Sequence, residues 1–132
     1  NQKCDEVETF DSQLNELITD MFDTMKAYDG IGLAAPQVGI LQRLFICKFR
    51  TQSLVCINPV LELSGDIITS KEACLSLPNL EADVPRHSHV KITAYDQFNK
   101  QYTKRFTAMM AIIIQHEYDH LNGVLITNYS TK

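Results

Sequence analysis

Three residues near the end of the chain could form the reactive part of a catalytic site: His116, Glu117 and His120, in a His-Glu-x-x-His pattern. Residues four apart on an α-helix lie on one face, one turn from each other. The two imidazoles could bind one metal ion, and the glutamate could take a proton from a water molecule held there. The alternative is a helix with two ordinary core or surface histidines, so the pattern needs support from the rest of the chain.

The residues around this pattern predict a helix that turns its histidines toward the protein interior. Thr107 is a candidate N-cap, and Gly123 is a candidate for the C′ position that ends the helix. The face that carries the histidines also carries the apolar residues Met109, Ile112 and Ile113. A catalytic metal site on this helix would therefore be partly shielded from water.

Two histidines leave a zinc-type site incomplete, because such sites take three protein ligands and keep one open position. Residues 121–132 contain no His, Cys, Asp or Glu, and Ile126 stands where an extended protease pattern has its third histidine. The third ligand must therefore lie upstream, at Cys74, His87, His89 or a carboxylate. Cys74 is favoured because polar residues flank it and a proline follows shortly after. The His-x-His pair more often faces solvent.

A second helix is expected near the N-terminus. Apolar residues from Leu14 to Met25 recur with the i, i+3, i+4, i+7 spacing of an amphipathic helix. Asp11 or Ser12 is the expected N-cap, and Gly30 is the expected C′ residue.

The middle of the chain alternates between apolar and polar residues, which is typical of strands. The expected strands cover residues 43–49, 54–57, 67–69, 90–95 and 102–106, with turns at 64–66 and 96–101 and a short last strand at 124–126. Cys47 and Cys56 lie in apolar runs and are expected to be buried. We therefore predict an α+β fold in which mostly antiparallel sheets pack around the C-terminal helix that carries His-Glu-x-x-His. A length of 132 residues fits one domain spanning 1–132.

Residues 30–39 contain three glycines and two alanines, and Gln37 is the only side chain there with a strong polar group. The glycine spacing does not match a dinucleotide-binding loop, and the segment follows a helix rather than a strand. Two interpretations remain. The segment could be a loop whose backbone a ligand approaches closely, or a tight connection that needs small residues for packing.

Composition excludes several classes of function. Hydrophobic residues make up 45% and charged residues 21% of the chain, as in ordinary globular proteins. A net charge of −4 without a large basic cluster argues against binding to nucleic acid or anionic membranes. No apolar run reaches the length of a membrane span, no signal peptide is recognisable, and the cysteines form no Cys-x-x-Cys pair. We therefore expect a cytoplasmic protein.

Three motifs, in order, are similar to those of the peptide deformylases. They are Gly-x-Gly-Leu-Ala-Ala-x-Gln at Gly30–Gln37, a variant of Glu-Gly-Cys-Leu-Ser at Glu72–Ser76, and Gln-His-Glu-x-Asp-His-Leu at Gln115–Leu121. The resemblance covers nearly the whole chain. It implies a hydrolase that removes the N-formyl group from the N-terminal methionine of nascent polypeptides and releases formate.

The resemblance also implies a role for individual residues. Cys74, His116 and His120 would bind one divalent metal ion, natively Fe²⁺, with Zn²⁺, Ni²⁺ or Co²⁺ as possible replacements. A water molecule on that ion would be the nucleophile, and Glu117 would act first as general base and then as general acid.

Further residues are implied for the transition state and the substrate. The side-chain amide of Gln37 and the backbone N–H of Leu75 would stabilise the oxyanion. The residues implied to contact the formyl-Met peptide are Ile31, Gly32, Met109, Ile112 and Ile113. The partners would be formylated peptides and nascent chains, without direct binding to nucleic acid or membranes, and we expect a monomer.

The chain departs from the family pattern in three places. Ala73 replaces the glycine of the second motif, which would add strain if that position needs a positive φ. Glu81 stands where many bacterial members have an arginine, so contacts to the substrate beyond its first residue could differ. The chain stops shortly after the second helix, so we expect a minimal catalytic domain without the long C-terminal helix that is associated with ribosome docking.

Two other functions are compatible with the motif alone. The first is a metallopeptidase or amidase of different specificity, which the changes at Ala73 and Glu81 would allow. The second is a metal-binding domain without catalysis. A purely structural metal site has no need for Glu117 or Gln37, so their presence favours an enzyme.

Overall fold

The computed structural model describes residues 3–74 and 77–125, and the side chains of residues 74 and 77–80 fall outside that description. The elements, in chain order, are α1 (Ser12–Ala27), β1 (Gly32–Ala34), the 3-10 helix η1 (Ala35–Val38), β2 (Leu44–Phe49), β3 (Gln52–Cys74), β4 (Leu77–Tyr95), β5 (Gln101–Thr107) and α2 (Ala108–Leu121). The strands form one antiparallel sheet in the order β1-β2-β3-β4-β5. Within the described residues, no helix is long and apolar enough to cross a membrane.

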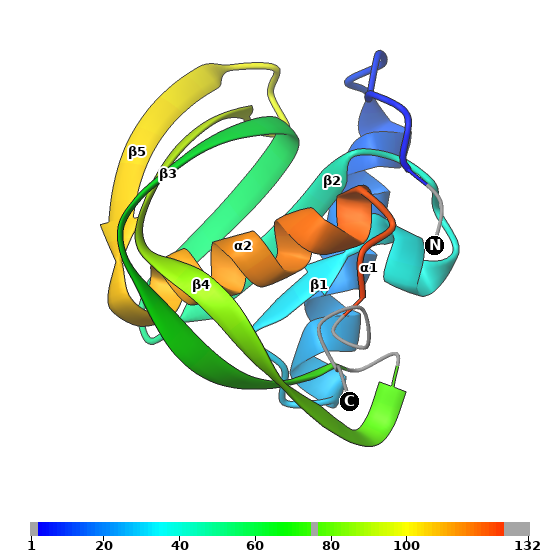
Figure 1. The fold of residues 1–132 in the computed structure, drawn as a ribbon. Helices are drawn as coiled ribbons and strands as arrows, with labels where there is room; N and C mark the ends of the chain where they lie inside the picture. The colour runs from blue at the N-terminus through cyan, green and yellow to red at the C-terminus, as the bar shows by residue number, and fades with distance from the viewer. Residues whose placement is uncertain (1–2, 75–76, 126–132) are drawn as a thin grey trace.

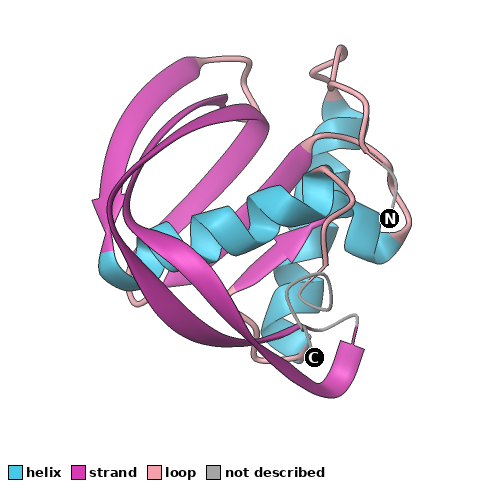
Figure 2. Ribbon diagram, viewed as in Figure 1, coloured by secondary structure: helices cyan, strands magenta, loops and turns pink. Residues whose placement is uncertain are grey.

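The sheet curves around α2, which runs through the centre of the molecule (Figure 1). The long strands β3 and β4 and the shorter β5 curve along one side of the helix, and β1 and β2 lie along the other (Figure 2). This arrangement confirms the predicted α+β fold with antiparallel strands around the His-Glu-x-x-His helix.

Strand β2 is buried on both faces because the two helices pack on opposite sides of it. Phe45 and Cys47 belong to the core cluster that contains α2 residues, whereas Leu44 and Ile46 belong to the cluster that contains α1 residues. Successive side chains of a strand point to opposite faces, so one apolar run serves both cores. The predicted burial of Cys47 and Cys56 is confirmed, since neither is exposed.

Helix α1 begins as predicted and ends one residue earlier than predicted. The Asp11 carboxylate accepts a hydrogen bond from the Leu14 N–H at 3.0 Å, which is an N-cap interaction. The prediction that Gly30 takes the C′ position is wrong. Asp29 adopts the positive φ of 55°, and the Gly30 N–H donates to the Met25 carbonyl at 2.8 Å. Aspartate is one of the few residues that tolerate this conformation.

The strands predicted at 54–57 and 67–69 are parts of one strand, β3, and the predicted turn at 64–66 is wrong. Asn58 and Gly65 have φ values of 51° and 78° and lie where the register between β3 and β4 shifts. These residues therefore bend the strand through bulges instead of ending it. Of the strand predicted at 124–126, Val124 and Leu125 lie outside any strand, and residue 126 falls outside the described residues.

The predicted hairpin between β4 and β5 is confirmed. Its turn is closed by Asp96, whose carboxylate accepts hydrogen bonds from the N–H groups of Phe98 and Lys100 at 2.9 and 3.0 Å. An aspartate side chain that bonds the backbone two residues further on is a common turn device.

Helix α2 follows β5 without a linker. Thr107 is the N-cap by position, although its side chain makes no capping hydrogen bond. At the other end, Gly123 has a φ of 75°, as a C′ glycine should. The abrupt junction forces Ala108, the first helical residue, to a φ of 55°. A left-handed conformation places the alanine Cβ close to the backbone and is strained.

We predict that Ala108→Gly stabilises the protein. Glycine would relieve the strain at φ 55°, although its larger conformational entropy in the unfolded state would offset part of this stabilisation. The free energy of unfolding should therefore rise by about 0.5–1 kcal/mol. Urea denaturation measures the change. The control is Ala27→Gly at the exposed end of α1, which should lower the free energy of unfolding by at most about 1 kcal/mol, the cost of glycine in a helix interior. A loss in both variants would mean that Ala108 is not strained.

Candidate active site

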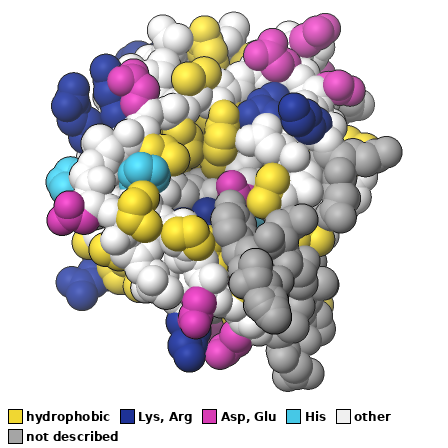
Figure 3. All heavy atoms as spheres, in the orientation of Figure 1, with side chains coloured by type: hydrophobic (Ala, Val, Ile, Leu, Met, Phe, Trp, Pro, Cys, Tyr) yellow, Lys and Arg dark blue, Asp and Glu magenta, His cyan; other side chains and the backbone are white. Residues whose placement is uncertain are grey.

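The two histidines of the motif lie together on α2, as their spacing predicts. The ring centroids of His116 and His120 are 5.1 Å apart, with the rings inclined at 68°. His120 is 5% exposed, so the pair faces the interior. Figure 3 shows the molecule in the orientation of Figure 1. Hydrophobic side chains gather there around a central hollow in which charged groups are visible.

A buried network of charged groups holds His116. Its Nδ1 atom lies 2.7 Å from Oε1 of Glu72 on β3. Arg86 on β4 donates to both carboxylate oxygens of Glu72, at 2.7 and 2.8 Å, and to Asp119 on α2 at 2.7 Å. Burial alone would raise the pKa of Glu72, but the hydrogen bonds from Arg86 and His116 lower it to about 2. Glu72 is therefore ionised at neutral pH.

This network fixes the orientation of the His116 ring. Because Glu72 is ionised and can only accept, Nδ1 must carry the proton and Nε2 must be the basic nitrogen. Nε2 faces the other way and lies 4.0 Å from Oε2 of Glu117. Histidine ligands of metals commonly donate their second N–H to a carboxylate in this manner. The arrangement of His116 therefore fits a bound divalent metal ion.

The predicted third ligand can be placed only by its backbone. Cys74 is the last residue of β3, two residues after Glu72, and its side chain lies outside the described residues. Leu75 also lies outside them. Among the side chains that are described, no three His, Cys, Asp or Glu residues form a metal-binding group. Of the alternatives, His89 is exposed on β4 and hydrogen-bonds Ser88 at 2.8 Å.

Glu117 lies against the first strand of the sheet. Its side chain is buried, and Gly32 of β1 is so close that a Cβ atom there would lie 2.6 Å from Oε2 of Glu117. The segment expected to be a glycine-rich loop is thus a short strand followed by a 3-10 helix. The small residues allow Glu117 of α2 to pack closely against β1, which agrees with the interpretation as a tightly packed connection. Close approach of a ligand to this backbone stays a prediction.

Gln37 is half-buried in η1, directly after β1. Its Oε1 atom accepts a hydrogen bond from the Ala34 N–H at 2.8 Å. This bond identifies the acceptor end of the amide and places its NH₂ group, which can only donate, on the other side. Donation is the role that an oxyanion requires.

The residues expected around the substrate differ in exposure. Ile31 and Met109 are 45% and 41% exposed, and Ile112 is half-buried. Ile113 is buried and packs in the core cluster between α2 and the sheet. Ala73 lies in extended strand opposite Glu81 and is not among the residues with positive φ, so replacing glycine there causes no backbone strain.

Sequence reasoning gave no structural role to Gln115. Its side-chain amide bonds both backbone groups of His87 on β4, accepting from the N–H at 3.0 Å and donating to the carbonyl at 2.8 Å. The pairing of β5 with β4 ends at His89, so Gln115 takes the place of the next strand residue. This contact sets the position of α2 along β4, next to His116.

Glu72, Arg86 and Asp119 were likewise not predicted as site residues. A signal for Arg86 exists in the sequence. It alternates with Val84 on a strand whose inward positions are apolar, and a charged residue in such a position needs a buried partner. Nothing in the local sequence identifies Glu72 as that partner, because 14 residues separate the two.

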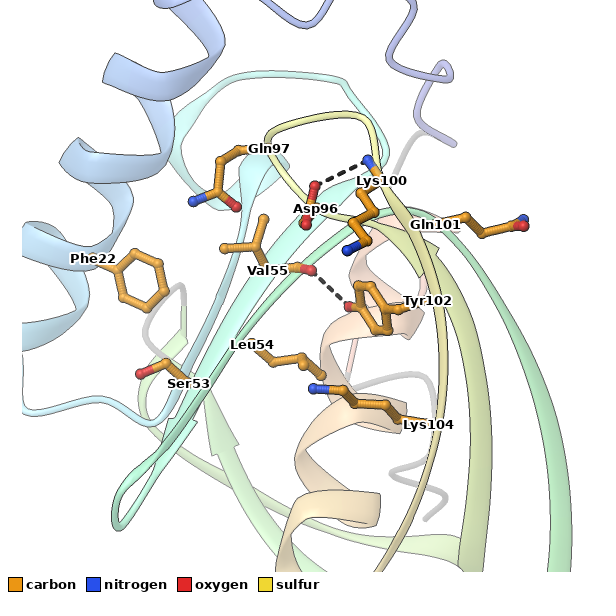
Figure 4. A pocket seen from close by; sticks show the side chains of 10 residues that line it. All are labelled: Phe22, Ser53, Leu54, Val55, Asp96, Gln97, Lys100, Gln101, Tyr102 and Lys104. Carbon is orange, nitrogen blue, oxygen red and sulfur yellow. Dashed lines mark hydrogen bonds between the residues drawn. The ribbon is translucent and has the colours of Figure 1, made fainter.

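A cavity elsewhere in the molecule has a volume of about 650 Å³. It lies between α1, the start of β3 and β5, and Tyr102 crosses it to donate a hydrogen bond to the Val55 carbonyl at 2.6 Å (Figure 4). No residue of the His-Glu-x-x-His motif lines it. A large pocket is often the default candidate for an active site. Here the chemistry of the side chains outweighs cavity size and favours α2.

Comparison with known proteins gives a consistent result. The model of the family described as polypeptide deformylase matches residues 1–132. A peptide deformylase of Clostridium botulinum is 46% identical over 132 residues, covering 99% of this chain and 89% of that protein. Peptide deformylase 1 of Bacillus subtilis is 42% identical over 129 residues, covering 96% and 80%.

Solved structures agree with these relatives. The crystal structure of peptide deformylase from Thermotoga maritima superposes with a TM-score of 0.95 at 35% identity, covering 99% of this chain and 90% of that one. A peptide deformylase from Synechococcus elongatus in complex with actinonin gives a TM-score of 0.95 at 38% identity, covering 99% and 72%. The chain therefore belongs to the polypeptide deformylase family of enzymes.

Proposed function

We propose that this protein hydrolyses the N-formyl group of N-terminal methionine in nascent polypeptides and releases formate. The observation that carries the proposal is the arrangement on α2, where His116, oriented by Glu72, stands beside Glu117 and His120. Membership of the deformylase family supplies the reaction class. We further propose that residues 1–132 act as one catalytic domain.

We propose that His116, His120 and Cys74 hold one divalent cation. Two imidazoles and a thiolate suit several first-row metals, so Zn²⁺, Ni²⁺ and Co²⁺ are compatible with the site as well as Fe²⁺. When bound, such a cation would lower the pKa of water to near neutrality and polarise the formyl carbonyl. Fe²⁺ as the native ion, the monomeric state and the cytoplasmic location stay predictions.

Glu117 is the proposed proton carrier. Its carboxylate would accept a proton from water as the water oxygen adds to the formyl carbon. It would then transfer that proton to the nitrogen as the carbon–nitrogen bond breaks, giving formate and a free amine. The side-chain NH₂ of Gln37 and the backbone N–H of Leu75 would stabilise the negative charge on the formyl oxygen. One such donor contributes about 2.7–4 kcal/mol to lowering the barrier.

The open edge of β1 offers a binding place for the peptide backbone. The Lys48 N–H donates to the Ile31 carbonyl at 2.8 Å, so Ile31 points its backbone groups toward β2. Backbone groups alternate along an antiparallel strand, so those of Gly32 point away from β2, toward the free edge. An extended peptide could pair there. Its methionine side chain would contact Ile31 and Met109, with Ile112 and Ile113 beneath.

We predict that Glu117→Ala lowers the rate of formate release from a formyl-Met peptide by about 10²–10⁴-fold, because the general base is lost. Metal content should not change, since the proposed ligands are intact. A coupled formate assay and metal analysis of the same samples test this. The control is Glu62→Ala, which removes an exposed carboxylate from β3. Undiminished turnover in Glu117→Ala would contradict the mechanism.

For the metal, we predict that Cys74→Ser lowers metal retention after dialysis against a chelator, since a hydroxyl is a poorer ligand than a thiolate. His89→Ala serves as the control, because His89 was an alternative ligand and is exposed on β4. Full metal occupancy in Cys74→Ser, together with loss in His89→Ala, would move the third ligand to β4.

Glu72→Gln should weaken metal binding by about 10–100-fold, because it removes the charge that orients His116 and makes its ring more basic. Competition with a fluorescent chelator measures the affinity. Glu62→Gln is the matched control. Its carboxylate pairs with Lys91 at 3.6 Å on the surface, where ion pairs contribute little. Equal affinities in both variants would show that the network does not act on the metal.

A further inference from the structure

The Glu117 side chain occupies the space in which a side chain at position 32 would lie. A Cβ atom added to Gly32 would lie 2.6 Å from Oε2 of Glu117, 2.9 Å from Cγ and 3.0 Å from Cδ. Real Cβ atoms essentially never lie closer than 3.0 Å to a heavy atom outside their own neighbourhood. The end of the Glu117 side chain thus fills the volume that any other residue at position 32 would occupy.

The backbone at position 32 does not itself require glycine. Gly32 lies in β1, paired with Cys47, and it is not among the glycines with positive φ, which include Gly39 and Gly65. An alanine could adopt this conformation, and glycine inside a strand is normally the less stable choice. Glycine therefore suits this position because it has no Cβ atom and leaves space for the Glu117 side chain.

The volume that glycine leaves to Glu117 lies on the face of β1 that is turned toward α2. Residues directly opposite in an antiparallel pair have their Cβ atoms on the same face, so a side chain at position 32 would point where Cys47 points. Cys47 packs in the core cluster with Ala111 and Ile114 of α2. The hydrogen bond with Cys56 and burial raise the pKa of Cys47, and the charge of Glu117 adds to this rise, as expected if Glu117 lies nearby.

We propose that Gly32 is a positioning residue, because the missing side chain determines where the carboxylate of Glu117 stands. This rests on the proposed role of Glu117 as proton carrier. Glu117 is 5% exposed, so its side chain is packed by the protein, and a Cβ at position 32 would have to displace it. A methyl group at position 32 would move the carboxylate by at least several tenths of an ångström to restore ordinary contact distances. The backbone groups of Gly32 point away from β2, toward the free edge, so peptide pairing should persist.

Unfolding temperatures of four pairs of proteins test the geometry without measuring activity. Gly32→Ala should lower Tm by about 3–10 °C in the parent protein, because overpacking is destabilising. It should do the same in Glu117→Gln, which keeps the shape of the side chain and removes its charge. In Glu117→Ala the space is empty, so Gly32→Ala should leave Tm unchanged or raise it slightly. As a control for an unrelated glutamate, Glu62→Ala should not alter the effect of Gly32→Ala.

Kinetics test the consequence for catalysis. In Gly32→Ala, kcat for a formyl-Met peptide should fall by about 100-fold, as a small misplacement of a catalytic group can cause. KM should stay within about threefold of the parent, and metal content should not change. A purely structural defect would lower the amount of folded protein or its metal content instead.

Three results would overturn the proposal. They are an equal loss of Tm from Gly32→Ala in the parent and in Glu117→Ala, an unchanged kcat with unchanged KM, and an unchanged kcat with raised KM. The last would mean that the new methyl group obstructs the peptide and not Glu117. If the parent protein released no formate, the proposed function would fail, while the unfolding temperatures would still decide whether Glu117 occupies the space above Gly32.

Discussion

The active-site region depends on one buried interaction, the bidentate pairing of Arg86 with Glu72. Both side chains are almost fully removed from water, at 3% and 7% exposure, and a buried charge without a partner is strongly destabilising. The pairing therefore constrains everything attached to it. Glu72 binds β3 to His116, and the second arm of Arg86 binds β4 to Asp119, so two strands and α2 must meet in one arrangement.

The long strands make this arrangement possible. Bulges near Asn58 and Gly65 curve β3 and its partner β4 around α2, and the curvature brings Glu72 and Arg86 to the C-terminal half of the helix. Gln115 adds a second fixed point by bonding both backbone groups of His87 where β5 ends. The histidines thus occupy a rigid part of the fold, and geometry fixed before ligand binding is what a metal site or a catalytic base requires.

The sequence predicts local features well and long-range partnerships poorly. The Asp11 N-cap, the Gly123 helix end and the Asp96 turn depend on residues close in sequence, and the structure has all three. The predicted strand end at residue 57 and the predicted turn at 64–66 are bulges within β3, because the same residue types favour both turns and bulges. Only the pairing with β4 determines whether these residues form a turn or a bulge. The partner of Arg86 could not be found either, since it is chosen by the register of two strands and not by neighbouring residues.

The two buried glutamates lie in different environments, which suit the different roles proposed for them. Glu72 binds Arg86 through both oxygens and His116 through one of them, and a pKa of about 2 keeps it ionised at any physiological pH. A carboxylate so firmly held is a poor proton acceptor, but it is well suited to orient an imidazole. Glu117 lies on the other side of His116, against the backbone of β1 and near the open edge where a peptide could bind. The same residue type is thus fixed as a structural anion on β3 and, on α2, lies where the proposed proton transfer needs a carboxylate, and the proposed packing constraint at Gly32 would determine where that transfer occurs.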